Sequence, residues 1–268
     1  MTASRHDLLI GAHADADPLG HAAAAGFSIM QTFIGDPQAW KGHAVDHPDG
    51  AAGLRKEAEQ ADVGLYIHAP YVINVATTNN RIRIPSRQIL ARQVKLATEV
   101  GARGVIVHGG HVSANDDPAV GFDNWRKAVE GLDLTVPILI ENTAGGANAM
   151  ARHLDRIAML WDAVGQASGA DNVGFCLDTC HAHASGMDPS GLVDAIKAIT
   201  GRIDLVHLND SRDAAGSGAD RHEVLGLGQA DPEFLVEVVR EANTATILET
   251  PGDAASHAAQ ADWLAALL

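Results

Sequence analysis

Residues that can ligate a metal ion end several short apolar segments of this 268-residue chain. Each segment is too short for a helix, is bounded by turn or helix signals, and has the apolar composition of a buried strand. The terminal residues are mostly histidine, aspartate or glutamate, which are ligands for zinc and related metals. The sequence therefore predicts a metal site where the segment ends meet. The segments are 9–13, 65–68, 105–108, 138–141, 175–178, 205–207 and 246–249.

The ligand-type residue stands at the C-terminal end of each segment, and this repetition predicts an α/β fold, the (βα)8 TIM barrel. In such a barrel the C-terminal ends of the parallel strands converge on one face, where the chemistry takes place. The length suits a single barrel domain over residues 1–268. An open doubly wound sheet is the alternative, but that fold gathers ligands at one switch point rather than at six or seven strand ends.

The alternation of expected strands and helices also predicts a parallel sheet. Strands are expected near 7–13, 28–34, 63–68, 104–109, 137–142, 173–178, 203–209 and 245–250. Helices are expected near 18–26, 51–61, 86–101, 119–131, 151–167, 189–200, 231–242 and 255–267. The longer connections follow strands, as they do on the active face of a barrel. These connections are 35–50, 69–85, 109–118, 142–150, 179–188 and 209–230.

Several of the expected helices carry signals at their ends. A capping or turn residue beside a proline predicts a helix start at 17–18, 85–86, 188–189 and 231–232. Gly101 and Gly201 are expected to end helices in the left-handed conformation.

The formal net charge of −15 argues against a generic nucleic-acid binder, which usually has a basic surface. Bound metal ions would neutralise the carboxylates of the site and make its face positive. Charge therefore does not decide between a nucleic acid and a small molecule as substrate. Five cationic residues gather in one loop and the helix start that follows it. They are Arg81, Arg83, Arg87, Arg92 and Lys95.

Residues 1–7 lack the apolar core of a signal peptide, and no apolar stretch is long enough to cross a membrane, so a cytoplasmic protein without a membrane partner is expected. Cys176 and Cys180 are the only cysteines. A structural disulfide is uncommon in a reducing compartment, and a thiolate zinc site usually has more cysteines. Both are interpreted as packing residues.

Nine residues form the predicted metal constellation, five histidines and four carboxylates. Singly, each has an ordinary explanation: Asp178 can cap a helix, and Glu249 can pair with an arginine. Burying all nine together without metal would cost heavily in desolvation and repulsion. At about three or four protein ligands per zinc, with one carboxylate bridging, they can hold three ions. The nine are His68, His108, Glu141, Asp178, His181, His207, Asp220, His222 and Glu249.

Around these residues the chain resembles the endonuclease IV family of apurinic/apyrimidinic (AP) endonucleases, over essentially its whole length. The motifs occur in the order and spacing of that family, which makes the resemblance specific. They are HAPYVIN at 68–74, VHGGH at 107–111, IENTAG at 140–145, CLDTCHA at 176–182, HLNDS at 207–211, GSG at 216–218, DRH at 220–222, LGLG at 225–228 and LET at 248–250.

The resemblance implies a zinc-dependent barrel that cuts DNA on the 5′ side of abasic sites, with three zinc ions per chain. His68, His108 and Glu141 would hold the first ion, and Glu141 would bridge to the second. The remaining ligands follow the same pattern. Asp178, His207 and Glu249 would complete the second site, and His181, Asp220 and His222 would hold the third. Manganese can replace zinc in part of such a site.

Glu141 and Glu249 are the expected catalytic residues, and a hydroxide activated by the zinc ions is the expected nucleophile. Glu141 would orient it, and Glu249 would assist proton handling. The products would be a 3′-hydroxyl and a 5′-deoxyribose phosphate, and blocked 3′ ends are a second expected substrate of a 3′-end-cleaning activity. The family resemblance further suggests a monomer.

Four residues are expected to contact double-stranded DNA. Gln38 stands where relatives can carry an arginine that enters the base stack, which puts that way of holding the DNA in doubt for this chain. Tyr71 matches a family tyrosine on the minor-groove side, and packing on the barrel rim is its alternative. Arg81 and Arg83 are the best candidates for phosphate contacts, with a solvated helix start as their alternative.

Two other classes of protein fit part of the pattern. A sugar isomerase or epimerase on a related barrel also uses histidine and carboxylate ligands, but it generally needs fewer metal ions. A non-catalytic protein that binds DNA or stores metal is the second alternative. The complete ligand set argues against it, since an inactive site usually lacks at least one ligand.

Overall fold

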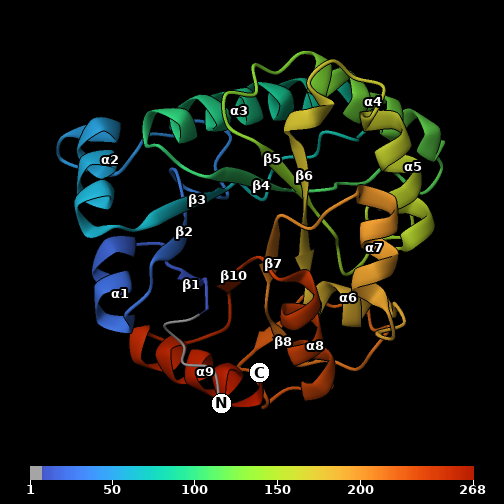
Figure 1. The fold of residues 1–268 in the computed structure, drawn as a ribbon. Helices are drawn as coiled ribbons and strands as arrows, with labels where there is room; N and C mark the ends of the chain where they lie inside the picture. The colour runs from blue at the N-terminus through green and yellow to red at the C-terminus, as the bar shows by residue number, and fades with distance from the viewer. Residues whose placement is uncertain (1–7) are drawn as a thin grey trace.

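A computed structural model describes residues 8–268 and shows a closed barrel of eight parallel strands, which confirms the predicted fold. Helices surround the strands on all sides (Figure 1). The expected strand start at residue 7 and the expectation drawn from residues 1–7 lie outside the described residues. The barrel strands are β1 (Ile10–His13), β2 (Ile29–Phe33), β3 (Gly64–His68), β4 (Gly104–His108), β5 (Ile138–Glu141), β6 (Val173–Asp178), β7 (Leu205–His207) and β10 (Ala245–Leu248).

The helices follow the strands in alternation, as predicted. They are α1 (Pro18–Ala25), α2 (Gly50–Ala61), α3 (Asn80–Glu99), α4 (Pro118–Glu130), α5 (Leu154–Val164), α6 (Thr179–Ser185), α7 (Leu192–Thr200), α8 (Pro232–Ala242) and α9 (Ala254–Leu267), with a short 3₁₀ turn at η2 (Ala170–Asn172). Asp17 and Asp231 cap α1 and α8 in front of a proline, as the sequence predicted. Gly101 and Gly201 adopt positive φ at helix ends, also as predicted.

Two of the predicted helix starts were wrong. Helix α3 begins at Asn80 and not at residue 86, because the Asn79 side chain caps it by accepting from the Arg81 amide, and Pro85 is tolerated inside the helix near its start. Helix α7 begins at Leu192 after Gly191, and not at residue 189.

Two of the expected loops contain secondary structure of their own. The connection 179–188 holds α6, and the connection 209–230 holds a small antiparallel hairpin. The hairpin strands are β8 (Asp210–Ser211) and β9 (His222–Glu223).

The strand register brings ligand-type residues side by side. His108 on β4 is level with Glu141 on β5, and Asp178 on β6 is level with His207 on β7. Below this level, buried apolar side chains fill the barrel, so the polar residues form a layer over an apolar floor. The floor consists of Ile29, Tyr66, Ile106, Leu139, Cys176, Leu205, Ala245 and Ile247.

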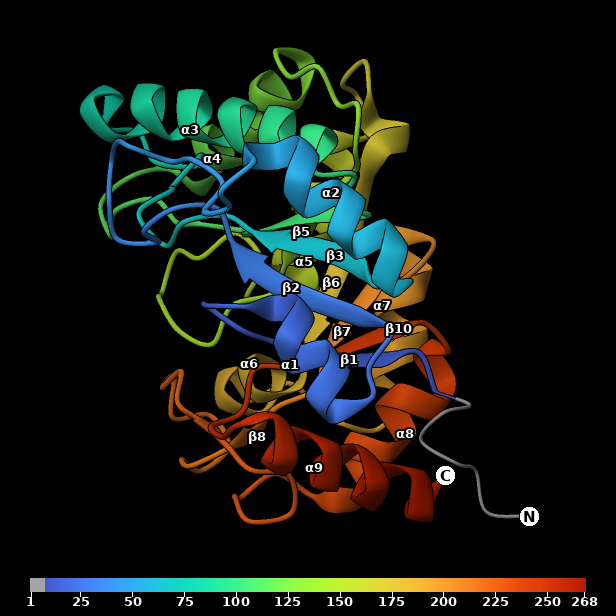
Figure 2. The same cartoon turned by 90° about the vertical axis from the view of Figure 1, so that its left-hand side faces the viewer.

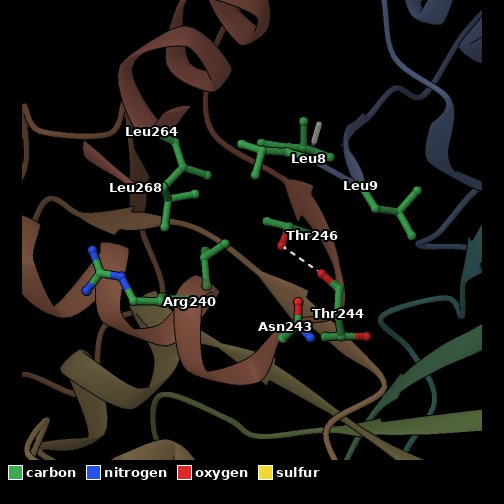
Figure 3. A pocket seen from close by; sticks show the side chains of 10 residues that line it. Leu8, Leu9, Arg240, Asn243, Thr244, Thr246, Leu264 and Leu268 are labelled. Carbon is green, nitrogen blue, oxygen red and sulfur yellow. Dashed lines mark hydrogen bonds between the residues drawn. The ribbon is translucent and has the colours of Figure 1, made fainter. Parts of the chain in front are cut away.

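The side view separates the two ends of the barrel. The loops after β2 and β5 project to the left of Figure 2, together with α6 and β8, which marks the C-terminal face. A hollow of about 450 Å³ opens at the opposite end, where β1 and β10 begin (Figure 3). Its lining residues include Leu8, Thr246, Leu264 and Arg240 and contain no histidine, cysteine, aspartate or glutamate. It is therefore not the predicted metal site.

Candidate metal centre

Glu141 lies at the middle of the polar layer, at the end of β5 and fully buried. One of its oxygens, Oε2, is 3.3 Å from His68 Nε2 and 3.2 Å from His108 Nε2. The other, Oε1, is 3.0 Å from His207 Nδ1 and 3.3 Å from His181 Nδ1. A carboxylate that faces different partners with its two oxygens has the geometry needed to bridge two ions.

The structure brings together all nine residues of the predicted constellation. Their potential ligand atoms fall into three groups in which every atom lies within 4.8 Å of the others. The groups are His68, His108 and Glu141; Glu141, Asp178, His207 and Glu249; and His181, Asp220 and His222. These are the three sets that the sequence predicted, with Glu141 shared by two of them.

Cys180 lies close enough to Asp178 and His222 to form a further possible group. Burial raises the pKa of the Cys180 thiol to about 12. Because a metal binds the thiolate and not the thiol, this environment favours the packing role predicted for Cys180. Cys176 also packs, as part of the apolar floor of the barrel.

Hydrogen bonds to backbone carbonyls orient three of the histidines. The Nδ1 of His68 donates to the backbone carbonyl of Ala69 at 2.8 Å. In the same way, His181 Nδ1 donates to the carbonyl of Asn142 at 2.8 Å, and His222 Nδ1 donates to the carbonyl of Glu249 at 3.3 Å. This arrangement fixes the tautomer and turns each Nε2 toward the cluster, as is usual for histidines that bind metal.

Two buried ring nitrogens test whether metal ions fit here. His181 Nε2 and His222 Nε2 are buried and make no hydrogen bond. They face the two oxygens of Asp220 at 3.0 and 3.1 Å. A buried polar atom without a partner is costly, and two imidazoles around one carboxylate are a suitable ligand set for zinc. The residues present therefore fit a metal ion.

The electrostatics of the cluster are set by burial and by opposite charges at close range. Burial by itself would raise the pKa of Glu141, but His108 and His207 outweigh it and hold that pKa well below its usual range. Burial likewise opposes ionisation of Glu249, yet nearby His207 lowers its pKa to about 2. For Asp178 burial prevails and the pKa is raised. Glu141 and Glu249 are thus anionic carboxylates that cationic metals would neutralise.

Gln31 is a part of the site that the sequence analysis missed. It is fully buried on β2, and its Oε1 accepts from His207 Nε2 at 2.8 Å. Its Nε2 donates to Glu249 Oε1 at 2.6 Å and to His13 Nδ1 at 3.0 Å. Gln31 therefore fixes His207 with Nδ1 free to ligate. A polar amide inside the apolar run of β2 was the signal that could have revealed it.

Asn209 has a similar role on the other side of the cluster. Its Nδ2 donates to Asp178 Oδ2 at 2.7 Å and to Glu249 Oε2 at 3.3 Å, and its Oδ1 accepts from the Glu249 amide at 2.8 Å. These bonds hold the two carboxylates in place for the second group.

We expect Gln31→Leu to lower zinc affinity by about 10- to 100-fold, the usual effect of losing a group that orients a ligand. Competition with a chelator of known affinity measures this directly. Gln93→Leu is the matched control, because Gln93 is equally buried but donates to the Ile34 carbonyl. Equal affinities of the Gln31→Leu variant and the unmodified protein would rule out the role.

Asp210 anchors the loop that carries Asp220 and His222, two of the three residues of the third group. Its buried carboxylate accepts from the amides of Ser211, Gly226, Gly228 and Ala230 at 2.7 to 3.0 Å. A Cβ on Gly228 would lie only 2.4 Å from Asp210 Oδ1, so this close approach requires glycine. The same loop returns through β9, where His222 pairs with Ser211.

Asp210→Ala should therefore destabilise the protein by at least ~3 kcal/mol, since hydrogen bonds to a charged group contribute about 1.5–3 kcal/mol each. It should also reduce the metal content by the ion of the third group. Urea unfolding and elemental analysis measure the two effects. Asp213→Ala is the control, since Asp213 lies in the same loop and pairs with Arg221. An unchanged metal content would contradict the anchoring role.

Comparison with known proteins places this chain in a family. Residues 19–267 match the family model described as a xylose isomerase-like TIM barrel. A Mycobacterium marinum protein described as a probable endonuclease 4 is 53% identical over 91% of this chain and 93% of its own length. The chain belongs to the endonuclease IV family.

Solved structures agree with this assignment. Endonuclease IV from Thermus thermophilus superposes with a TM-score of 0.79 at 29% identity, covering 94% of this chain and 95% of that one. A D-tagatose 3-epimerase-like protein gives a TM-score of 0.77 at 18% identity, covering 95% of both chains, which shows a shared fold only. In the part of this endonuclease IV family member that the structure describes, no helix is long and apolar enough to span a membrane.

The residues predicted to contact DNA differ in their placement. Tyr71 is 55% exposed, with its ring centre 5.5 Å from that of His68 and 5.9 Å from that of His108. Gln38 is exposed and lines a hollow of about 670 Å³ together with Tyr71 and Glu249. Both residues therefore stand at the rim of the metal centre.

The two arginines lie in the first turn of α3 and not in the loop where the sequence analysis placed them. The Arg83 guanidinium donates to the carbonyls of Thr77 and Thr78 and contacts Asn80 Oδ1. The Arg81 side chain is exposed. Geometry thus favours Arg81 over Arg83 as a residue that can reach an external phosphate.

Proposed function

We propose that this protein is a DNA-repair AP endonuclease that hydrolyses the phosphodiester bond on the 5′ side of abasic sites. The products are a 3′-hydroxyl and a 5′-deoxyribose phosphate, and removal of blocked 3′ groups is a second activity of the same site. The observation that carries the proposal is the convergence of nine ligand-type residues into three groups that share Glu141. Membership of the endonuclease IV family supports it.

In this proposal each chain holds three zinc ions, one in each group, with manganese able to replace zinc in part. Such ions polarise a phosphate and lower the pKa of water toward about 7 when they are bound. Residues 1–268 act as one domain and as a monomer. Light scattering should then give a mass near 28.0 kDa.

The protein's own residues supply orientation and proton handling. Glu141 orients the attacking water from the floor of the site, because its buried carboxylate is held among four histidines. Glu249 is held by Gln31 and Asn209 and lines the hollow that also contains Tyr71. Its position at that opening suits it to accept a proton during hydrolysis.

Recognition of the substrate depends on shape. An abasic nucleotide has lost its base and part of its stacking, so bending the DNA and extruding this nucleotide costs less than for an intact one. Tyr71 and Gln38 stand at the opening of the hollow and are the residues placed to contact such DNA.

The third ligand group favours the nuclease over a sugar isomerase or epimerase. His181, Asp220 and His222 form a complete group in addition to the two that share Glu141. An isomerase site generally uses one or two ions, so a metal content near three per chain supports the nuclease and a content of one or two supports the isomerase.

An incision assay tests the function. Zinc-loaded protein is mixed with a labelled duplex that carries one tetrahydrofuran abasic analogue, beside an intact duplex. Cleavage just 5′ of the analogue, leaving a 3′ end that a polymerase extends, is the expected result, since the analogue resists β-elimination. Protein with its full metal load that leaves the analogue uncut would overturn the proposal.

A further inference from the structure

A second hollow, of about 630 Å³, lies between the loop after β2 and the first half of α3. The loop is tied to the helix by Arg92, whose Nε and Nη2 both donate to the His43 carbonyl at 2.9 and 2.7 Å. We call this hollow the α3 groove. The lining residues used below are Trp40, Lys41, His43, Arg81 and Arg92.

The charge of the α3 groove is opposite to that of the protein. Lys41, Arg81 and Arg92 line it and no carboxylate does, although the chain has a formal net charge of −15. Arg81 also lies in the first turn of the 20-residue helix α3, where unpaired backbone amides add partial positive charge. The groove is therefore suited to an anionic ligand.

His43, which is also in the α3 groove lining, has ring nitrogens that lack hydrogen-bond partners. It is only 2% exposed, and neither of its ring nitrogens has a hydrogen-bond partner in the structure. A buried imidazole without partners is costly. Both ring nitrogens are closed to solvent, so a phosphate oxygen bound in the α3 groove can accept from the His43 N–H group only after the ring turns toward it.

Trp40 connects the α3 groove with the metal centre. Its side chain is 42% exposed. It lines the α3 groove and also a neighbouring hollow of about 380 Å³ that contains Tyr71 and His108. Trp40 therefore borders both the α3 groove and the hollow beside the metal centre. Exposed aromatic residues next to a basic groove are the usual platform for bases of a nucleic-acid strand.

We propose that the α3 groove binds the sugar–phosphate backbone of the DNA strand beside the lesion, with one base stacked on Trp40. Lys41 and Arg81 contact phosphates, Arg92 holds the loop after β2 against α3, and His43 donates to a phosphate once its ring turns toward the groove. This inference rests on the proposed function, because it takes the strand to continue from the metal centre. It explains how a strongly acidic protein can hold DNA.

The phosphate contacts are tested by the salt dependence of binding. Fluorescence anisotropy measures the Kd of a duplex with a tetrahydrofuran site over a series of salt concentrations. Each lost phosphate contact lowers the slope of log K against log salt by about 0.9, so Lys41→Gln with Arg81→Gln should lower it by about 1.8. The control pair is Arg55→Gln with Lys95→Gln, which removes the same charges from the surfaces of α2 and α3 outside the groove. An equal change in both pairs, or no change in either, overturns the proposal.

The stacking contact is tested at Trp40 itself. Trp40→Ala should raise the Kd by about tenfold, the scale of one base stacked on an aromatic residue. Trp40→Phe should restore most of the affinity and abolish the change in tryptophan fluorescence on DNA binding. A fluorescence change that persists in Trp40→Phe overturns the stacking contact.

A competition experiment distinguishes a groove that binds a DNA strand from a site that binds any phosphate ion. Inorganic phosphate at the same ionic strength should not displace the duplex, and displacement would show an isolated phosphate site instead. All these measurements report binding and not incision. A protein that binds the duplex through the groove and fails to cut it would contradict the proposed function alone.

Discussion

Replacing Glu141 with glutamine should reduce DNA cleavage by at least ~10³-fold. Loss of a group that merely orients a ligand costs about 10- to 100-fold, and Glu141 is a predicted ligand shared by two groups. Glutamine has one acceptor oxygen and no charge, so it cannot face His68 and His108 with one carboxylate oxygen and His207 with the other. Single-turnover cleavage of the tetrahydrofuran duplex measures the loss.

The control for this experiment is Glu223→Gln, since Glu223 follows the ligand-type residue His222 but belongs to none of the three groups. It should cleave at a rate close to that of the unmodified protein. Circular dichroism and elemental analysis show whether the Glu141→Gln variant is folded and how much metal it has lost. A folded Glu141→Gln variant that cleaves at near-normal rate would exclude the bridging role.

Glu249→Gln separates metal binding from proton handling. Glu249 lies at the edge of the second group, where Gln31 Nε2 and Asn209 Nδ2 each donate to one of its two oxygens, and glutamine can keep one of these two bonds. We expect this variant to keep its fold, to retain more metal than Glu141→Gln and to lose most of its activity. Near-normal turnover would remove Glu249 from the reaction.

Stripping the metal with a chelator should lower the melting temperature by about 8 °C or more. A ligand at 1,000 times its Kd stabilises the folded state by about 4 kcal/mol, and 1 kcal/mol shifts the melting temperature of a domain of roughly this size by about 2–4 °C. The cause is electrostatic, because Glu141, Asp178 and Glu249 meet in one buried group and, without metal, only the histidines offset their mutual repulsion. Differential scanning calorimetry before and after chelation measures the shift.

Adding zinc back should restore the melting temperature, and magnesium at the same concentration should not, because imidazole-rich groups select zinc over magnesium. The Glu141→Gln variant should respond less to the chelator than the unmodified protein does. Identical melting temperatures for the stripped and loaded proteins would show that the cluster contributes nothing to folding.

The barrel and six of the nine cluster residues could be predicted from the sequence because one rule generates both. The other three, His181, Asp220 and His222, end no barrel strand and were predicted from the CLDTCHA and DRH motifs. A ligand-type residue that ends a strand must lie on the C-terminal face of a parallel barrel, so the position in the chain fixes the position in space. His68, His108 and Glu141 follow this rule, and the registers of β4 with β5 and β6 with β7 confirm it.

The supporting residues could not be predicted in this way. Gln31 occupies the interior of β2, where its amide has no ligand chemistry of its own and gains a role only from contacts with His207 and Glu249. Asp210 accepts hydrogen bonds from four backbone amides, and these amides come together only because of the path that the loop takes in space. The start of α3 was predicted wrongly because Pro85 beside Ser86 has the pattern of a helix start. The residue that caps the helix is Asn79, six residues earlier than Pro85.

The closure of the barrel between β1 and β10 determines when the complete metal centre can form during protein synthesis. Glu249 directly follows β10, the last strand of the barrel, and its hydrogen bond to Gln31 spans two residues far apart in the chain. On the ribosome, the N-terminal strands and five of the nine ligand-type residues emerge well before His207, Asp220, His222 and Glu249. A nascent chain that has emerged only as far as His181 therefore lacks four of the nine ligand-type residues. Hydrolytic activity toward DNA must wait until synthesis has passed residue 249.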